Sequence, residues 1–171
     1  MNNGSEDIPN NKQLDLDENE ALKLAEELRI NLKKGKKPID SKENINLLIK
    51  GLADKRGLLR RTFAKHLGII GKSALPELCE SLINHKNVIV RRAAAKTLKL
   101  VGEPEALPFL FNALINDDDV IVQCSAAGAM AVFGEKAINH FLKVFTNPSS
   151  DSMQCGLAAW GLSFIAQDAP E

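Results

Sequence analysis

The sequence of 171 residues has no tyrosine, one tryptophan and only 5% aromatic residues. It lacks any run of about 18 apolar residues, the length that a membrane span needs. Its acidic, asparagine-rich start does not follow the charged-then-apolar plan of a signal peptide. We therefore expect a cytoplasmic protein without a membrane segment. Alanine and leucine are abundant instead, and this composition predicts helices that pack through small and aliphatic side chains.

Cysteine and catalytic motifs are also scarce. Cys79, Cys124 and Cys155 form an odd set without a CxxC spacing, so neither a disulfide framework nor a zinc site is expected. Glycine-rich phosphate loops, paired acidic motifs and Ser/His/Asp patterns are absent, and the three histidines are isolated from one another. The sequence predicts no catalytic residue, no metal site and no required cofactor, and it leaves open whether the protein is an enzyme.

The net charge is zero, but the charges are segregated along the chain. Residues 33–99 carry 17 basic and 5 acidic groups, whereas residues 1–32 carry 3 and 8, and residues 100–171 carry 2 and 9. A basic middle of this kind can steer an anionic partner, although helical arrays also carry charged faces for solubility alone.

A period of 31 or 32 residues runs through most of the chain. Each unit contains two segments with apolar residues at helical spacing, and a single helix pair cannot bury its apolar face, so the units must stack. The pattern predicts an all-α fold, an α-solenoid of about four helix pairs. We place the array at residues 40–171, with repeats at 43–71, 74–102, 105–134 and 136–166.

The predicted core follows from the alignment of the repeats. Gly71, Gly102 and Gly134 stand where a helix would end in a left-handed conformation. The first helices of the repeats place two columns of large apolar residues in the core: Leu48, Leu78, Leu110 and Phe141, then Leu52, Leu82, Leu114 and Phe145. The second helices contribute three more columns: Leu59, Val90, Val122 and Met153; Phe63, Ala94, Ala126 and Leu157; Leu67, Leu98, Met130 and Gly161.

The two ends of the chain differ from the repeats. Residues 1–13 hold too few apolar groups to offset the entropy of ordering and are predicted to be disordered. Residues 14–35 predict one amphipathic helix ahead of the array, ended by Gly35 and Pro38. The final "QDAPE" is similar to "GEPEAL" at Gly102, the start of another first helix. We therefore expect an array that is truncated at its C-terminus.

The segment "VRRAAAKTLKLVGEPEALPFL" from Val90 resembles HEAT-like repeats of the phycobilin lyase type. These occur in cyanobacterial E/F-type bilin lyases and in related proteins of bilin biosynthesis or phycobilisome degradation. The resemblance covers about residues 43–166. It implies a binding protein of bilin metabolism, a lyase-like subunit or chaperone that holds a bilin, a phycobiliprotein subunit or both, and it implies a possible companion HEAT-repeat subunit.

The same resemblance implies a structural ladder between repeats. In HEAT repeats an Asp at the turn after the first helix meets an Arg early in the second helix. Here the turn column is Asp54, Asn84, Asn116 and Asn147, and the second column is Arg60, Arg91, Gln123 and Gln154. We assign both columns to structure before ligand contact, because an Arg fork suits carboxylate and amide oxygens.

By HEAT analogy the second helices line a concave surface, and their outward stripe changes character halfway. In the first two repeats it is cationic: Arg61, Lys65, Arg92, Lys96 and Lys99. In the last two it carries small, thiol and apolar residues: Cys124, Gly128, Ala131 and Cys155, with Trp160 one position away. These positions predict a groove that is cationic at one end and apolar at the other.

Such a groove suits more than one ligand. A bilin could place its two propionates on Arg61, Arg92, Lys65 or Lys96 and its tetrapyrrole over Cys124, Gly128 and Trp160. A generic interaction scaffold for an acidic protein with an apolar anchor fits equally well. Nucleic-acid binding is less favoured, because aromatic residues are few and the basic middle has acidic flanks. A purely structural interpretation also stays open, in which the apolar positions are covered by further repeats and the cations are merely solvated.

Overall fold

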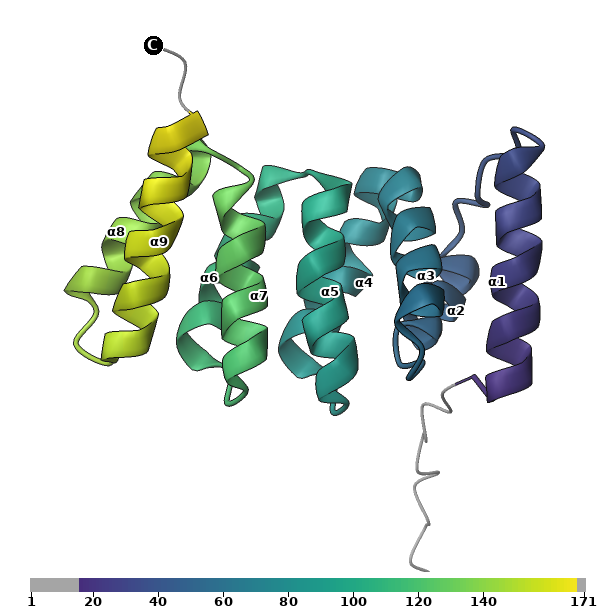
Figure 1. Cartoon of the computed structure of the whole chain (residues 1–171), viewed down its shortest axis with the longest axis horizontal. Helices are drawn as coiled ribbons and strands as arrows, with labels where there is room; N and C mark the ends of the chain where they lie inside the picture. The colour runs from purple at the N-terminus through teal and green to yellow at the C-terminus, as the bar shows by residue number, and fades with distance from the viewer. Residues whose placement is uncertain (1–15, 169–171) are drawn as a thin grey trace, which may run out of the picture.

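The computed structural model describes residues 16–168, and within this range every regular element is a helix, without strands (Figure 1). The predicted disordered tail, residues 1–13, lies outside the described residues. The helices are α1 (Glu18–Lys33), α2 (Lys42–Gly51), α3 (Gly57–Ile70), α4 (Leu75–Asn84), α5 (Val88–Val101), α6 (Leu107–Asn116), α7 (Val120–Ala131), α8 (Glu135–Thr146) and α9 (Ser152–Asp168), with 3-10 turns at Gly71–Ala74 and Pro104–Ala106.

The helices form two layers, as a solenoid requires. Helices α3, α5, α7 and α9 pack side by side in one layer, and α2, α4, α6 and α8 form the other behind it (Figure 1). Helix α1 stands in the first layer, beside α3. The four pairs α2–α3, α4–α5, α6–α7 and α8–α9 confirm the predicted α-solenoid. In the part of the chain that the structure describes, no helix is long and apolar enough to cross a membrane.

Local signals in the sequence set the helix boundaries. Asp17 caps α1 through a capping box with Glu20, and Ser41, Asn87 and Asp119 accept hydrogen bonds from the first turns of α2, α5 and α7. The glycines after the second helices have positive φ, 74° at Gly71, 76° at Gly102 and 59° at Gly134. Other residues adopt a positive φ only with strain. Gly71 and Gly102 cap the ends of α3 and α5 as predicted, Gly102 in the αL conformation. Gly134 instead directly precedes α8, because α7 already ends at Ala131.

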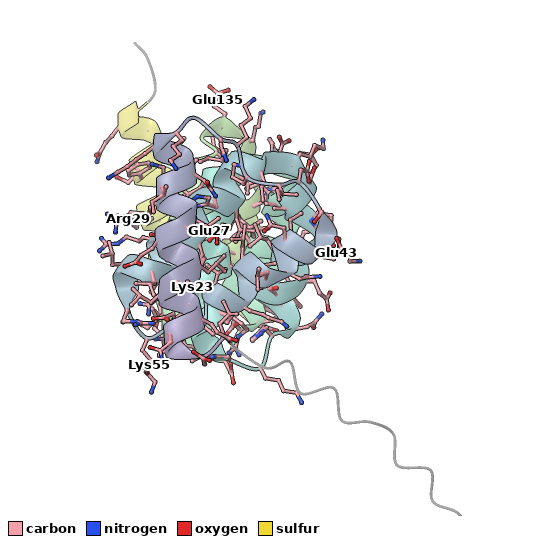
Figure 2. The ribbon with its side chains drawn as sticks, turned by 90° about the vertical axis from the view of Figure 1, so that its right-hand side faces the viewer. Lys23, Glu27, Arg29, Glu43, Lys55 and Glu135 are labelled. Atoms are coloured by element: carbon pink, nitrogen blue, oxygen red, sulfur yellow. The ribbon has the colours of Figure 1, made fainter. Side chains whose placement is uncertain are left out.

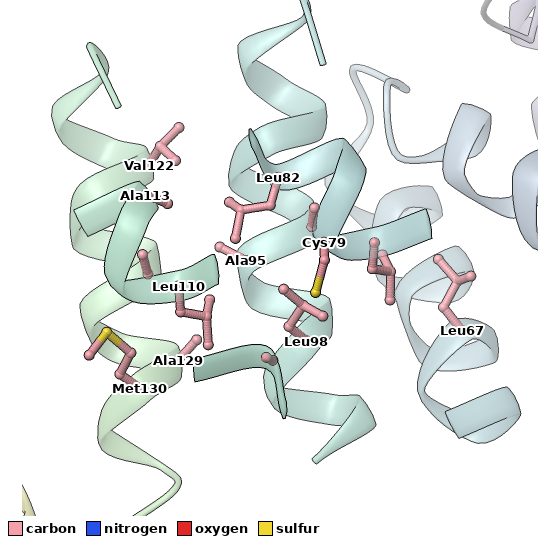
Figure 3. Packing of buried hydrophobic residues seen from close by; sticks show 14 of the residues in the cluster. Leu67, Cys79, Leu82, Ala95, Leu98, Leu110, Ala113, Val122, Ala129 and Met130 are labelled. Atoms are coloured by element: carbon pink, nitrogen blue, oxygen red, sulfur yellow. The ribbon is translucent and has the colours of Figure 1, made fainter. Parts of the chain in front are cut away.

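The core columns of the first three repeats are buried as predicted. The side chains of the second and third repeats interdigitate between the layers, as Figure 3 shows for Leu82, Leu98, Leu110 and Met130. Phe63, which fills its column in the first repeat, packs where Gly51 leaves space: a Cβ added at Gly51 would lie 2.5 Å from its ring.

The fourth repeat departs from the predicted columns. The ring of Phe141 fills the space above Gly161, where an added Cβ would clash with it. Val144 is fully buried, whereas Phe145, which was predicted for the core, is 49% exposed. Positions three and four residues apart both return to the same helix face, so Val144 can take the place that the column assigned to Phe145.

Candidate functional site

The surface of the α3, α5 and α7 layer contains an open groove of about 660 Å³, which we call the central groove. Its lining residues come from the start of α3, the first three turns of α5 and the first turn of α7. They are Lys55, Gly57, Arg60, Arg61, Ala64, Ile89, Arg92, Ala93, Lys96 and Ile121. The structure therefore brings together three residues of the predicted cationic stripe, Arg61, Arg92 and Lys96.

The cations of the central groove are held to different degrees. Arg60 donates through Nη1 to the backbone oxygens of Asp54, at 2.6 Å, and Lys55, at 2.9 Å. Arg61 and Lys96 are exposed, and neither forms an ion pair within residues 16–168. The groove's available anion-binding groups are consequently these two side chains and Lys55, which is likewise exposed and forms no ion pair among the described residues.

Arg92 is already engaged by a carboxylate of the next repeat. Its Nε and Nη2 donate to the two carboxylate oxygens of Asp119, at 2.9 and 2.6 Å. This bidentate pair raises the pKa of the Arg92 guanidinium and holds the pKa of Asp119 below its ordinary value. Arg92 is thus a fixed cation at the edge of the groove, with part of its charge compensated.

The residues of the predicted ladder bond mostly within their own repeat, and with acceptors other than those predicted. Arg60, Arg91 and Gln123 each donate to a backbone oxygen six residues earlier, those of Asp54, His85 and Asp117. Gln154 instead reaches back to the oxygen of Ile115, at 3.0 Å. A backbone carbonyl can accept from either an Arg or a Gln side chain, so the column tolerates the change of residue type.

The turn asparagines do not pair with the Arg and Gln column, as the predicted ladder required. Asn84 donates to Glu80, Asn116 donates to Asn112, and Asn147 accepts from the backbone of Ser149. The carboxylate of Asp54 pairs with Arg56 rather than with Arg60, and this lowers the pKa of Asp54. These turn side chains are not needed as acceptors, because backbone carbonyls accept the hydrogen bonds of the Arg and Gln column.

Arg91 forms a largely buried ion pair between repeats. It donates through Nε and Nη2 to the carboxylate of Asp117, at 2.8 and 3.1 Å, across the junction between the second and third repeats. Both side chains are largely buried, and Nη2 also reaches Asp118 at 2.8 Å. The sequence reasoning missed the run Asp117–Asp118–Asp119, although three consecutive acidic residues ahead of a helix opposite two arginines were a readable signal.

The predicted apolar end is not part of the central groove. The groove stops at Ile121, and its apolar wall consists of Ile89, Ala93 and Ile121 instead of Cys124, Gly128, Cys155 and Trp160. Ala131, placed on the outward stripe, is buried at 2% exposure because it packs in the core. Trp160 is 49% exposed and stacks at 5.7 Å on Phe164 of its own helix.

Two predicted cations also lie outside the central groove. Lys65 lines a separate groove between α1 and α3, and Lys99 is exposed and lines neither groove. The apolar residues Ile89 and Ile121 were missed, since each precedes a core valine and was not assigned to the outward stripe. Within the described residues, no cluster of three His, Cys, Asp or Glu side chains is placed to hold a metal.

The stacked helix pairs and their ladder define the class of the protein. Residues 75–160, half of the chain, match the family of HEAT repeats, and the chain belongs to this family. It is 53% identical over 170 residues to the bilin biosynthesis protein MpeU of Synechococcus sp. (strain WH8020). The match covers 99% of this chain and 56% of the relative, so the chain spans about half the length of the relative. Both findings confirm the resemblance to HEAT-like repeat proteins of bilin metabolism.

Proposed function

We propose that the protein serves bilin metabolism by holding an open-chain tetrapyrrole in the central groove, as a lyase-like subunit or chaperone. Two findings support this proposal. The relative that matches nearly the whole chain is a bilin biosynthesis protein. The groove's volume of about 660 Å³ lies in the range of about 300–1,000 Å³ that small-molecule sites occupy.

The observation that carries the proposal is the pairing of free cations with an apolar wall. A bilin is a flat apolar body with two propionates. Arg61 on α3 and Lys96 on α5 can bind one carboxylate each from opposite sides of the groove, while Ile89 and Ile121 cover the pyrrole rings. Arg92, fixed by Asp119, defines the edge of the site.

Absorbance spectroscopy tests the bilin proposal directly. Mixing the protein with phycocyanobilin or phycoerythrobilin should shift and sharpen the visible band, and the double variant Arg61→Glu with Lys96→Glu should abolish the shift. The control variant Lys136→Glu with Lys143→Glu changes the same charge on α8, away from the groove, and should bind as the wild type does. An unchanged bilin spectrum with the wild-type protein would overturn the proposal.

A second candidate, an interaction scaffold, is favoured by the last helix. Apart from its final residue, Asp168, α9 carries no charged side chain, and Trp160 is half exposed on it. We propose that this face docks a companion HEAT-repeat subunit or a phycobiliprotein subunit. Trp160→Asp should prevent pull-down of phycobiliprotein subunits, or of a companion chain, without changing bilin absorbance. Unchanged pull-down by the Trp160→Asp variant would show that this face of α9 is not the interface.

A further inference from the structure

Helix α1 is fixed against α3 at two points along its length. Arg56 donates through Nη2 to the backbone oxygen of Glu18, at 2.7 Å, and the Nε2 of His66 lies 3.2 Å from the backbone oxygen of Leu28. Both links join residues 38 positions apart, so the two helices run parallel in constant register. Ala21, Ala25 and Leu28 of α1 are also buried, so the two helices are held in place and the shape of the exposed space that remains between them is fixed.

That space is a second groove, of about 360 Å³, on the same side of the layer as the central groove. Its lining residues, which define the α1–α3 groove, are Arg29, Leu32, Lys33, Leu58, Arg61, Thr62 and Lys65. Figure 2 views the molecule from the α1 end, and Arg29 and Lys55 project on one side of α1, away from Glu43. Arg61 lines both grooves, so the two sites adjoin along α3.

The α1–α3 groove has four cations and no acidic lining residue. Arg29, Lys33, Arg61 and Lys65 form no ion pair within the part of the chain that the structure describes. Leu58 presents an apolar surface between them and is 56% exposed. Cations without carboxylate partners around an exposed leucine are complementary to a ligand that carries both negative charge and apolar groups.

We propose that the α1–α3 groove docks an acidic segment of another protein, with carboxylates on its four cations and an apolar side chain over Leu58. A polypeptide is favoured over a nucleic acid because the lining offers an aliphatic surface and no aromatic side chain for stacking a base. Glu26, one turn before Arg29, borders the outer side of α1 and would repel a polyanion that extended past the groove. This docking site shares Arg61 with the central groove, and its other cations, Arg29, Lys33 and Lys65, lie outside that groove.

The test uses a short fluorescein-labelled peptide of alternating Glu and Leu, followed by fluorescence anisotropy. Wild-type protein should bind it, and Lys33→Glu with Lys65→Glu should weaken binding by about tenfold or more, because like charges would then face each other. Leu58→Ser should weaken binding severalfold. The variant Lys136→Glu with Lys143→Glu carries the same charge change on α8 and should bind normally. Circular dichroism checks that all variants are folded.

Several outcomes would overturn the docking proposal. One is equal loss of binding in the α8 control, which would indicate non-specific attraction. Another is that polyglutamate or a single-stranded oligonucleotide of equal charge binds as tightly as the Glu–Leu peptide, or that Leu58→Ser has no effect. Lys33 and Lys65 do not line the central groove, so their double variant should leave bilin absorbance unchanged. Failure of this proposal is thereby distinguishable from failure of the bilin proposal.

Discussion

Helices α5 and α7 begin with the same three residues, "VIV", and differ in the charge that follows. The residues they share in position, Val90 with Val122 and Leu98 with Met130, are fully buried. In α5 the pair Arg91 and Arg92 follows the shared start, and in α7 the same positions hold Gln123 and Cys124. The comparison shows that stacking and surface chemistry are encoded at different positions of one repeat.

The two arginines of α5 are complementary to the acidic turn before α7. Arg91 pairs with Asp117 and Arg92 with Asp119, so charge is concentrated at the junction between the second and third repeats. Within residues 16–168, no ion pair crosses the next junction, and Gln154 crosses it to the backbone oxygen of Ile115. The change from Arg to Gln along the column therefore marks a change from charged to neutral coupling between repeats.

The largest effects should come from the buried positions that α5 and α7 share. Leu98→Ala and Met130→Ala should each lower the free energy of unfolding by about 2–5 kcal/mol, because each leaves a cavity between the layers. Urea denaturation measures both. Leu100→Ala, at a half-exposed position of α5, is the control and should change stability little. Clearly different losses of unfolding free energy for Leu98→Ala and Met130→Ala would show that the two positions are not equivalent in the core.

Making α5 resemble α7 at the ladder should be the next most costly change. Arg91→Gln keeps a donor for the backbone oxygen of His85 but loses the bidentate bond to the buried carboxylate of Asp117. We expect a loss of about 1.5–3 kcal/mol in the free energy of unfolding. Lys99→Gln removes a charge from the exposed face of the same helix and should be neutral. A neutral Arg91→Gln would mean that the charged junction contributes nothing to stacking.

Glycine substitutions compare the open face of α7 with the packed face of α9. A Cβ at Gly161 would clash with the ring of Phe141, so Gly161→Ala should cost about 1–3 kcal/mol of stability. A Cβ at Gly128 would meet nothing within 4 Å, so Gly128→Ala should stabilise α7 by about 0.5–1 kcal/mol. Thermal unfolding followed by circular dichroism distinguishes the signs. Destabilisation by Gly128→Ala would show that the stripe is not open there.

The Asp119–Arg92 pair makes stability depend on pH. Because Arg92 lowers the pKa of Asp119, the pair stabilises the fold above the unfolded pKa of about 3.9, and the contribution is lost as pH falls through the lower folded pKa. Asp119→Asn keeps a good helix cap but removes the ion pair with Arg92. It should lower the free energy of unfolding by about 1 kcal/mol near neutral pH. Urea denaturation at several pH values should show this difference shrinking below about pH 4. Asp118→Asn, at an exposed carboxylate, is the control.

The thiols should show the smallest effect of the comparison. Cys79 is 2% exposed, and burial raises the pKa of its thiol to about 12. Cys124 and Cys155 are partly exposed. A colorimetric thiol reagent at pH 8 should label Cys124 and Cys155 first and reach Cys79 only after denaturant is added. Labelling of Cys79 at the same rate as Cys124 in the native protein would contradict the packing of α4.

The repeat period and the core were predictable, because both depend on the spacing of apolar residues along the chain. Leu48, Leu78 and Leu110 repeat at positions that stacking alone requires, and glycines at 71 and 102 mark the helix ends. Phe145 was misplaced because position 161 holds a glycine where the other repeats hold a large residue, and the ring of Phe141 packs there while Val144 is buried in place of Phe145. That packing involves two helices, and no pattern within one helix reveals it.

The site was predictable only in part. Arg61, Arg92 and Lys96 lie together because they occupy equivalent outward positions on neighbouring helices. The sequence did not indicate that Ile89 and Ile121 line the groove or that Arg92 pairs with Asp119. Both depend on how the start of one helix faces the next helix. The α1–α3 groove was missed altogether, since nothing in the repeat pattern indicates that α1 joins the layer beside α3.

The packing of α1 chiefly against α3 has a consequence for hydrogen exchange. In a solenoid each element is stabilised by its neighbours. Among the described residues, α1 packs chiefly on α3, whereas α5 and α7 each pack on a layer neighbour at either side. Local opening should therefore release the amides of α1 before those of the central repeats. Each opening of α1 also takes apart one wall of the α1–α3 groove, so a bound acidic segment would slow exchange throughout the helix by stabilising its closed state.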